Sequence, residues 1–313
     1  MSRSHYKTIL VLTFLLALAS VAHGKSRQKV IYGADNRVEV RDTSATYAEL
    51  SRSTAALIKL DSLTLEGDNY KSNSSVKSLK DSLNLCAKEK FAEQPFLASC
   101  SGFLVGEDIV VTAGHCYKGF MQSACDDHVW VFGFEGQDNG DKEYSFPKEN
   151  VYKCKKVIKS VLDSASKMDY SIIQLDRKVT DRQTLRFRKS GELKVGDALV
   201  VIGHPWGLPS KVADGAKVLD VSNKVFVTTN LDTFQGNSGS AVFNAETGLV
   251  EGILVRGKTD ATMKFDEEEG RVCRTLNYCK EDGTECSVDD QMIKGEDVTR
   301  ISGLAEELAK LGL

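Results

Sequence analysis

Proline is scarce in this chain, and paired cysteine motifs are missing. Only four prolines occur in 313 residues, which excludes a proline-rich hinge between modules. No two of the eight cysteines form a CxxC pair, and few histidines lie near them, which argues against a zinc site. No internal repeat or low-complexity linker is visible, and the length suits one large domain or two fused modules.

A strong charge of either sign is also missing. The formal net charge is -3, from 41 basic and 44 acidic residues. Such a mildly acidic chain has no electrostatic footprint for a nucleic acid, so we expect no nucleic-acid partner.

The long apolar run of the chain lies near its N-terminus, from Ile9 to about Ala19. Basic residues precede it and small residues follow it, a layout typical of a secretory signal. The alternative is a membrane anchor, but the run is shorter than the roughly 20 apolar residues that span a bilayer. Cleavage after Gly24 would remove Arg3 and Lys7 and leave 289 residues of formal charge -5. We therefore expect a secreted protein, extracellular or periplasmic, with no membrane contact after signal removal.

The cysteines all follow this segment, and an even number in an oxidising compartment predicts disulfides. They are Cys86, Cys100, Cys116, Cys125, Cys154, Cys273, Cys279 and Cys286. Three of them lie in an acidic stretch, Lys258–Lys294, which carries ten acids and six bases. We interpret this stretch as a solvated insertion, because its acids do not have the spacing of a calcium loop.

Short runs rich in Val, Ile and Phe alternate with Gly, Asn and Asp, which favours a β-sandwich or a pair of barrels. Helical periodicity is limited to Leu79–Ala92 and to Ser302–Leu311, where Ser302 is the expected cap. The expected strands are Thr54–Leu60, Ser101–Val105, Ile109–Thr112, Val129–Phe132, Ser171–Leu175, Ala198–Ile202, Lys224–Thr228 and Gly248–Val255.

Three polar residues follow one another in the order of an acyl-transfer triad. His115 ends a Val-rich strand, Asp169 begins another strand, and Ser238 stands between two glycines in GNSGS. Taken singly, each is more simply a structural residue, and Ser238 a turn residue. The order His, Asp, Ser is one of the known orders of such a triad.

Together these motifs resemble the trypsin-like serine endopeptidase superfamily. They are TAGHC at Thr112–Cys116, DYSIIQLD at Asp169–Asp176 and GNSGS at Gly236–Ser240. Within it, VIYGADNR at Val30–Arg37 and the neutral Asn237 before the serine resemble the bacterial V8-like (glutamyl endopeptidase-like) group.

The resemblance covers nearly the whole mature chain and implies an all-β fold. The expected fold is two packed antiparallel six-stranded Greek-key β-barrels with a C-terminal helix. It implies a peptidase domain at 30–313, with barrels at about 30–185 and 190–300 and a helix at about 302–312.

The resemblance also implies the role of each residue. Ser238 is the nucleophile, His115 the base that takes its proton, and Asp169 the group that orients the imidazole. The N–H groups of Gly236 and Ser238 would form the oxyanion hole. This chemistry needs no metal and no organic cofactor; the expected partners are protein or peptide substrates, and we expect a monomer.

In trypsin-like enzymes the pair corresponding to Cys100 and Cys116 is bridged, so the resemblance implies this disulfide. The other six cysteines can pair in 15 ways. Activation through an acid before the nucleophile is not available, since that place holds Asn237. A short pro-segment at 25–29, removed after Lys29, would leave a Val-Ile start like that of V8-like enzymes.

The sequence leaves undecided which residue type the specificity pocket prefers before the cleaved bond. Thr233 matches the threonine of enzymes that cut after Glu, but Leu254 stands where those enzymes have a histidine. Asp232 matches the acid with which trypsin-like enzymes bind Lys or Arg, unless it caps a turn. Arg256, on the same wall, would neutralise Asp232 or bind an acidic side chain. Basic residues are slightly favoured before the cleaved bond, and acidic ones are the alternative.

The sequence argues against two other functions. A catalytically silent trypsin-like binding or adhesion protein usually lacks a triad residue or the oxyanion glycine, and here all are present. An esterase of the α/β-hydrolase type needs G-x-S-x-G and the order Ser, Asp, His, neither of which this chain has.

Overall fold

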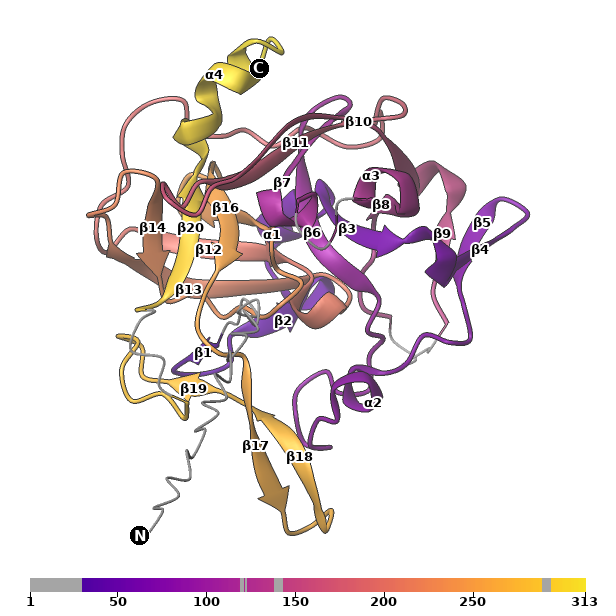
Figure 1. Ribbon diagram of the computed structural model, residues 1–313, viewed down its shortest axis with the longest axis vertical. Coiled ribbons are helices and arrows are strands. Elements are labelled where there is room, and N and C mark those ends of the chain that lie inside the picture. The colour runs from indigo at the N-terminus through magenta and orange to yellow at the C-terminus, as the bar shows by residue number, and fades with distance from the viewer. Residues whose placement is uncertain (1–29, 119–120, 122, 138–142, 289–293) are drawn as a thin grey trace, which may run out of the picture.

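Two antiparallel β-barrels lie side by side in the computed structural model, which describes residues 30–118, 121, 123–137, 143–288 and 294–313 (Figure 1). The expected fold of two six-stranded barrels is confirmed. The expected signal at 1–24 and pro-segment at 25–29 lie outside the described residues.

The first barrel closes in the order β10-β11-β7-β6-β3-β8. Its core is filled by large side chains that point inward from alternate positions, among them the fully buried Phe103, Trp130 and Phe132. Its strands are β3 (Thr54–Lys59), β6 (Ala98–Gly106), β7 (Ile109–Thr112), β8 (His128–Phe132), β10 (Val151–Leu162) and β11 (Asp169–Leu175).

The second barrel runs in the order β12-β15-β16-β20-β14-β13, and pairing of β12 with β13 closes it. Its strands are β12 (Ala198–Gly203), β13 (Lys211–Asp220), β14 (Phe226–Thr229), β15 (Ala241–Asn244), β16 (Val250–Arg256) and β20 (Glu296–Arg300).

The N-terminal segment belongs with the second barrel, contrary to the expected start of the first barrel at about residue 30. β1 (Ile31–Tyr32) pairs in parallel with β19 (Tyr278–Cys279), and β2 (Arg37–Glu39) pairs with β13. Val30 and Ile31 are fully buried there. Burial of these apolar side chains stabilises the arrangement, and the first barrel begins only at β3.

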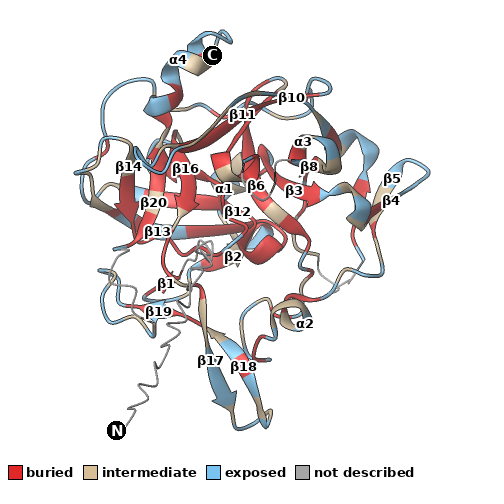
Figure 2. Cartoon of the chain, in the orientation of Figure 1, coloured by how far each residue is buried: buried red, intermediate tan, exposed pale blue. Residues whose placement is uncertain are grey.

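Two small sheets project from the barrels. β4 (Leu63–Glu66), β5 (Asn69–Ser72) and β9 (Ser145–Pro147) form one of them. The other is the hairpin β17 (Ala261–Asp266) and β18 (Arg271–Leu276), part of the expected acidic insertion. Figure 2 shows the contrast between buried barrel strands and the more exposed hairpin.

The helices are short. The α-helices are α1 (Ala45–Ser51), α2 (Leu79–Leu83), α3 (Ala124–Asp127) and α4 (Ala305–Ala309). The described 3-10 turns are η1 (Val40–Asp42), η2 (Leu60–Ser62), η3 (Gly114–Cys116), η5 (Lys148–Asn150), η6 (Pro205–Gly207) and η7 (Ile301–Leu304). None of the helices within the described residues is long and apolar enough to cross a membrane.

The expected C-terminal helix is confirmed apart from its cap, whereas the expected helix at 79–92 is wrong in its length. The expected helix at 79–92 stops after Leu83, because Asn84 takes a left-handed conformation (φ 54°) and ends it. At the C-terminus a short helix is present, but Ser302 is not its cap. Ser302 lies inside η7, and α4 begins three residues later at Ala305.

Four disulfides use all eight cysteines. The implied bridge Cys100–Cys116 is confirmed, and it fastens β6 to η3. The other bridges are Cys86–Cys273, Cys125–Cys154 and Cys279–Cys286. These bonds, like the expected export, fit an oxidising compartment.

Candidate active site

His115 and Asp169 face each other at the ends of two neighbouring strands. β7 and β11 are paired, and His115 follows β7 in η3 while Asp169 begins β11. The His115 ring Nδ1 lies 3.0 Å and 3.2 Å from the two carboxylate oxygens of Asp169. The backbone N–H of His115 also donates to Asp169 Oδ1 at 3.0 Å. Two donors thus hold a carboxylate that is almost fully buried, and the geometry fixes Nδ1 toward the acid.

Ser238 is carried to the same place by the loop between β14 and β15. The backbone N–H of Ser101 on β6 donates to the Ser238 carbonyl at 2.8 Å. The Ser101 hydroxyl donates to the Gly236 carbonyl, also at 2.8 Å. These bonds attach the serine loop of the second barrel to the strand that is bridged to η3.

Gly239 makes this close approach possible. It has φ +90°, and a Cβ atom there would lie 2.1 Å from the Ser101 carbonyl oxygen and 3.0 Å from the Ala113 nitrogen. A side chain would therefore push the loop away from the first barrel. Ala113 stands two residues before His115, so the contact brings the serine loop beside the histidine turn.

The backbone N–H groups of Gly236 and Ser238 lie in the turn that carries the serine. Among the hydrogen bonds of the described residues, neither N–H has an acceptor. Gly236 has φ +93°, which favours glycine at this turn. Asn237 is turned inward instead, where its side-chain oxygen accepts a hydrogen bond from the Ser240 hydroxyl at 3.2 Å. Two N–H groups are therefore available close to the serine.

The charged residue Asp232 interacts with the N-terminal segment. Its two carboxylate oxygens accept the backbone N–H groups of Tyr32, at 2.7 Å, and Asn36, at 2.9 Å. Burial raises the pKa of Asp232 to about 7, although both N–H donors act in the opposite direction. This arrangement agrees with the alternative interpretation, in which the carboxylate caps a turn.

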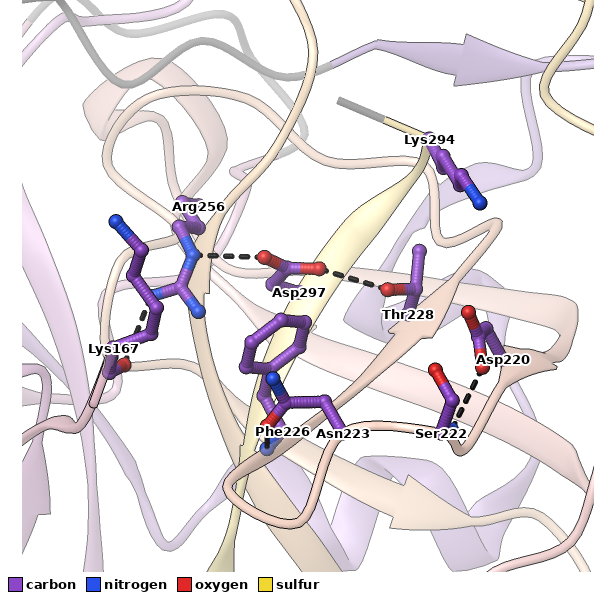
Figure 3. A pocket seen from close by; sticks show the side chains of 9 residues that line it. All are labelled: Lys167, Asp220, Ser222, Asn223, Phe226, Thr228, Arg256, Lys294 and Asp297. Atoms are coloured by element: carbon purple, nitrogen blue, oxygen red, sulfur yellow. Dashed lines mark hydrogen bonds and ion pairs between the residues drawn. The ribbon is translucent and has the colours of Figure 1, made fainter. Parts of the chain in front are cut away.

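Arg256 also has a different partner from the one considered. Its Nε donates to Asp297 Oδ2 at 2.7 Å, and its guanidinium lies over the Phe226 ring, 4.6 Å from the centroid. Arg256 therefore does not neutralise Asp232, as one interpretation of the sequence expected. It lines a cavity of about 420 Å³ together with Lys167, Thr228 and Lys294, and Figure 3 shows these side chains.

The two uncharged pocket candidates have separate roles. Leu254 packs its side chain into the core of the second barrel. Its backbone N–H donates to the Ser240 carbonyl and its carbonyl accepts from Gly239, so Leu254 supports the serine loop. The hydroxyl of Thr233 donates to Glu296 Oε2 at 2.6 Å.

Glu296 was missed by sequence reasoning, although its side chain is fully buried. It stands in GEDVTR, beside the acidic insertion, where an acid looks like a solvated one. The apolar alternation that marks a strand is weak there, so neither β20 nor its first residue was predicted.

His204, which precedes η6, is a buried packing residue. Its Nδ1 lies 3.0 Å from the Leu208 carbonyl, and its ring stacks on Phe134. Burial lowers the pKa of His204 to about 4, so the ring is neutral at physiological pH and serves packing.

Within the part of the chain that the structure describes, two groups of side chains have the proximity of metal ligands. They are Cys100 with His115 and Cys116, and Cys86 with Asp266 and Cys273. All four sulfur atoms are in disulfides, so they offer no thiolate to a metal.

Comparison with known proteins places this site in a family. Residues 100–253 match the trypsin-like peptidase domain. A probable serine protease do-like of Buchnera aphidicola subsp. Acyrthosiphon pisum is 24% identical over 265 residues, which cover 78% of this chain and 50% of the relative. A probable periplasmic serine endoprotease DegP-like of Buchnera aphidicola subsp. Schizaphis graminum is 25% identical over 50% of this chain and 36% of the relative. The chain thus spans half or less of the length of these curated relatives.

Solved structures show the same fold. A Glu endopeptidase has a TM-score of 0.50 at 13% identity, over 90% of this chain and 99% of the other. Human heparin binding protein has a TM-score of 0.50 at 12% identity, over 88% and 96%. At these identities the likeness concerns the fold alone. The family match shows that residues 100–253 of this chain form a trypsin-like peptidase domain, and the relatives are named as serine proteases.

Proposed function

We propose that this protein is a secreted serine endopeptidase that cleaves peptide bonds through an acyl-enzyme on Ser238. The observation that carries the proposal is the 3.0 Å contact between His115 Nδ1 and Asp169, beside which the Ser238 loop is attached. The relatives are named as serine proteases, which supports the reaction class.

The first chemical step is proton transfer. A serine hydroxyl is a weak nucleophile at neutral pH and needs a base. Asp169 would hold the proton of His115 on Nδ1, so that Nε2 can accept the Ser238 proton. The serine oxygen then attacks the carbonyl carbon of the substrate. His115 returns the proton to the leaving amine, and water releases the acyl group by the same route.

Stabilisation of the tetrahedral intermediate would come from the backbone. The N–H groups of Gly236 and Ser238 have no acceptor among the described residues. They can donate to the oxyanion without first breaking a bond inside the protein. Removal of one such donor typically costs about 10²- to 10³-fold in rate.

The compartment follows from two findings. Four disulfides and a relative named as periplasmic indicate an extracytoplasmic protein. Export by the signal at 1–24 is part of the proposal, as is action as a monomer on protein or peptide substrates.

Removal of residues 25–29 is a further part of the proposal. Val30 is fully buried, and its carbonyl accepts the Thr233 N–H at 3.3 Å. Cleavage after Lys29 would therefore begin the chain at a residue that is buried beside Thr233. The neutral side chain of Asn237 accepts a hydrogen bond from the Ser240 hydroxyl. Activation would therefore not use an ion pair at Asn237.

The test uses purified, disulfide-bonded mature protein. A fluorophosphonate probe should label the wild type, and a peptide library analysed by mass spectrometry should show cleavage. Ser238→Ala should abolish labelling and lower cleavage at least about 10³-fold, with an unchanged melting temperature. Ser222→Ala, on an exposed loop, is the matched control and should behave as the wild type. A folded, processed wild type that neither labels nor cleaves would support the silent binding protein instead.

A further inference from the structure

Glu296 lies at the meeting point of three segments that surround the serine loop. Its carboxylate accepts hydrogen bonds from the Thr233 hydroxyl at 2.6 Å and from the Lys258 backbone N–H at 3.1 Å. The Tyr32 hydroxyl lies 3.3 Å from Oε1. Thr233 precedes Ser238 by five residues, and Lys258 lies two residues after the end of β16, which forms the other wall. The carboxylate thus stands between the two walls that lead to the serine.

The two walls are joined next to the nucleophile, and farther along the Glu296 carboxylate lies against the main chain of one of them. Near Ser238 they are held together by the hydrogen bond from Gly239 to the Leu254 carbonyl at 2.8 Å. Farther along, a Cβ atom on Gly257 would lie 1.9 Å from Glu296 Oε2. The absence of a side chain at Gly257 therefore gives the carboxylate its space against the main chain.

The neighbours of Glu296 donate hydrogen bonds to its carboxylate. The Thr233 hydroxyl and the Lys258 N–H both donate to it. Burial and, next, the charge of Glu296 raise the pKa of Tyr32 far above its ordinary value, so this phenol remains a donor.

The two charges considered first are engaged elsewhere. Asp232 accepts two backbone N–H groups of the N-terminal segment. Arg256 is paired with Asp297 on the other side of β20. Glu296 is thus a buried carboxylate that contacts the serine loop through Thr233 and the segment after β16 through Lys258.

We propose that Glu296 is the charged end of the pocket for the residue before the cleaved bond (P1), and that it selects Lys or Arg. The inference rests on the proposed function and names its substrate class. A long cationic side chain that enters between the walls would end at this carboxylate and form a charge-assisted hydrogen bond. An acidic side chain would meet a buried like charge, which is strongly unfavourable.

The experiment compares kcat/KM for peptides that differ only in P1, after titration of active sites with a fluorophosphonate. The wild type should cleave after Lys or Arg at least 100-fold better than after Gln or Glu. Glu296→Gln should lose at least 100-fold on the Lys and Arg peptides and stay within a few-fold on the Gln peptide. This split distinguishes recognition from a structural role, which would lower all substrates together.

Glu251→Gln is the matched control. Glu251 is a buried carboxylate of the same barrel, but its partner is Arg188. The variant should lose stability and keep the P1 preference. If Glu296→Gln does not fold, competitive inhibition of the wild type by benzamidine, an amidinium probe, provides the second measurement, with inhibition expected at micromolar concentration.

The outcomes separate the two proposals. A titratable wild type that prefers acidic or apolar P1 residues would overturn the role of Glu296 and leave the endopeptidase intact. The same holds if Glu296→Gln keeps the Lys and Arg preference, or if benzamidine does not compete. A wild type without any titratable serine would overturn the proposed function, and this inference with it.

Discussion

The backbone N–H of Ser101 donates to the carbonyl oxygen of Ser238, and this 2.8 Å hydrogen bond crosses from one barrel to the other. Ser101 follows Cys100, which is bridged to Cys116 beside His115. The position of the candidate nucleophile relative to its base is thus fixed through backbone and disulfide rather than through mobile side chains. Sites held in this way keep the accuracy that catalysis requires.

Asp169→Asn should lower kcat by about 10⁴-fold with little change in KM. The amide oxygen of the new side chain can still accept the backbone N–H of His115. The amide nitrogen then faces the ring Nδ1 and, as a donor, stabilises the wrong imidazole tautomer. Steady-state kinetics on one peptide measure the effect. Asp163→Asn, at an exposed position nearby, is the control; a loss of less than tenfold for Asp169→Asn would exclude an orienting role.

Gly239→Ala should destabilise the fold and displace the serine loop. The new Cβ atom would collide with the Ser101 carbonyl, at 2.1 Å, in addition to the strain of φ +90°. Gly248 has φ +66° but nothing closer than 4.0 Å, so Gly248→Ala measures the strain alone, about 1–2 kcal/mol. Urea unfolding should show a clearly larger loss for Gly239→Ala, together with lost activity. Equal losses would mean that the loop relaxes freely.

The contribution of Asp232 to stability should fall as pH rises. Burial raises its pKa to about 7 in the folded state, against about 3.9 in the unfolded chain. Between these values the folded state binds more protons, so stability decreases with rising pH by up to about 1.4 kcal/mol per pH unit. The difference in unfolding free energy between wild type and Asp232→Asn from pH 4 to 8 isolates this effect.

The comparison of wild type with Asp232→Asn is needed because His204 changes the pH dependence of stability in the opposite direction. Its lowered pKa of about 4 makes stability decrease as pH falls below about 6.5, and it does so equally in both proteins. A difference that does not change with pH would show that the N–H donors of Tyr32 and Asn36 outweigh burial.

Removal of the Cys86–Cys273 disulfide should cost more than removal of Cys279–Cys286. The first bridge joins residues 187 apart and the second joins residues 7 apart. Chain-entropy arguments give about 5 and about 2.5 kcal/mol for such loops taken singly. Double substitutions to alanine, compared by urea unfolding, should therefore differ by about 2 kcal/mol, given that other bridges shorten the larger loop. The reverse order would mean that unfolded-state entropy does not control the effect.

The barrel strands with apolar alternation could be predicted from the sequence. Ile109–Thr112 coincides with β7, and each of the other expected runs overlaps a strand. β10 was missed because its lysines and exposed positions hide the pattern. Its identity as a strand depends on pairing with β8 and β11, which no local signal contains.

In the candidate site, too, some residues could be predicted from the sequence and others needed the fold. His115 and Asp169 could be proposed from their motifs, because each stands at the end of an identifiable strand. The hydrogen-bond partners of Asp232 could not be predicted, because the backbone N–H groups of Tyr32 and Asn36 are 200 and 196 residues away in the sequence. Glu296 needed the fold as well, because only tertiary structure shows that this acid is buried against Thr233.

The Cys86–Cys273 bond connects a segment before the first barrel's β6 with the hairpin of the second barrel. Most of the molecule lies between these two cysteines. In concentrated solution one peptidase molecule can cleave another, and such cleavage occurs mostly in exposed loops. A single nick anywhere between residues 86 and 273 would leave two fragments that stay covalently joined. Such a molecule would migrate as one intact chain until it is reduced, so limited self-digestion need not dissociate it.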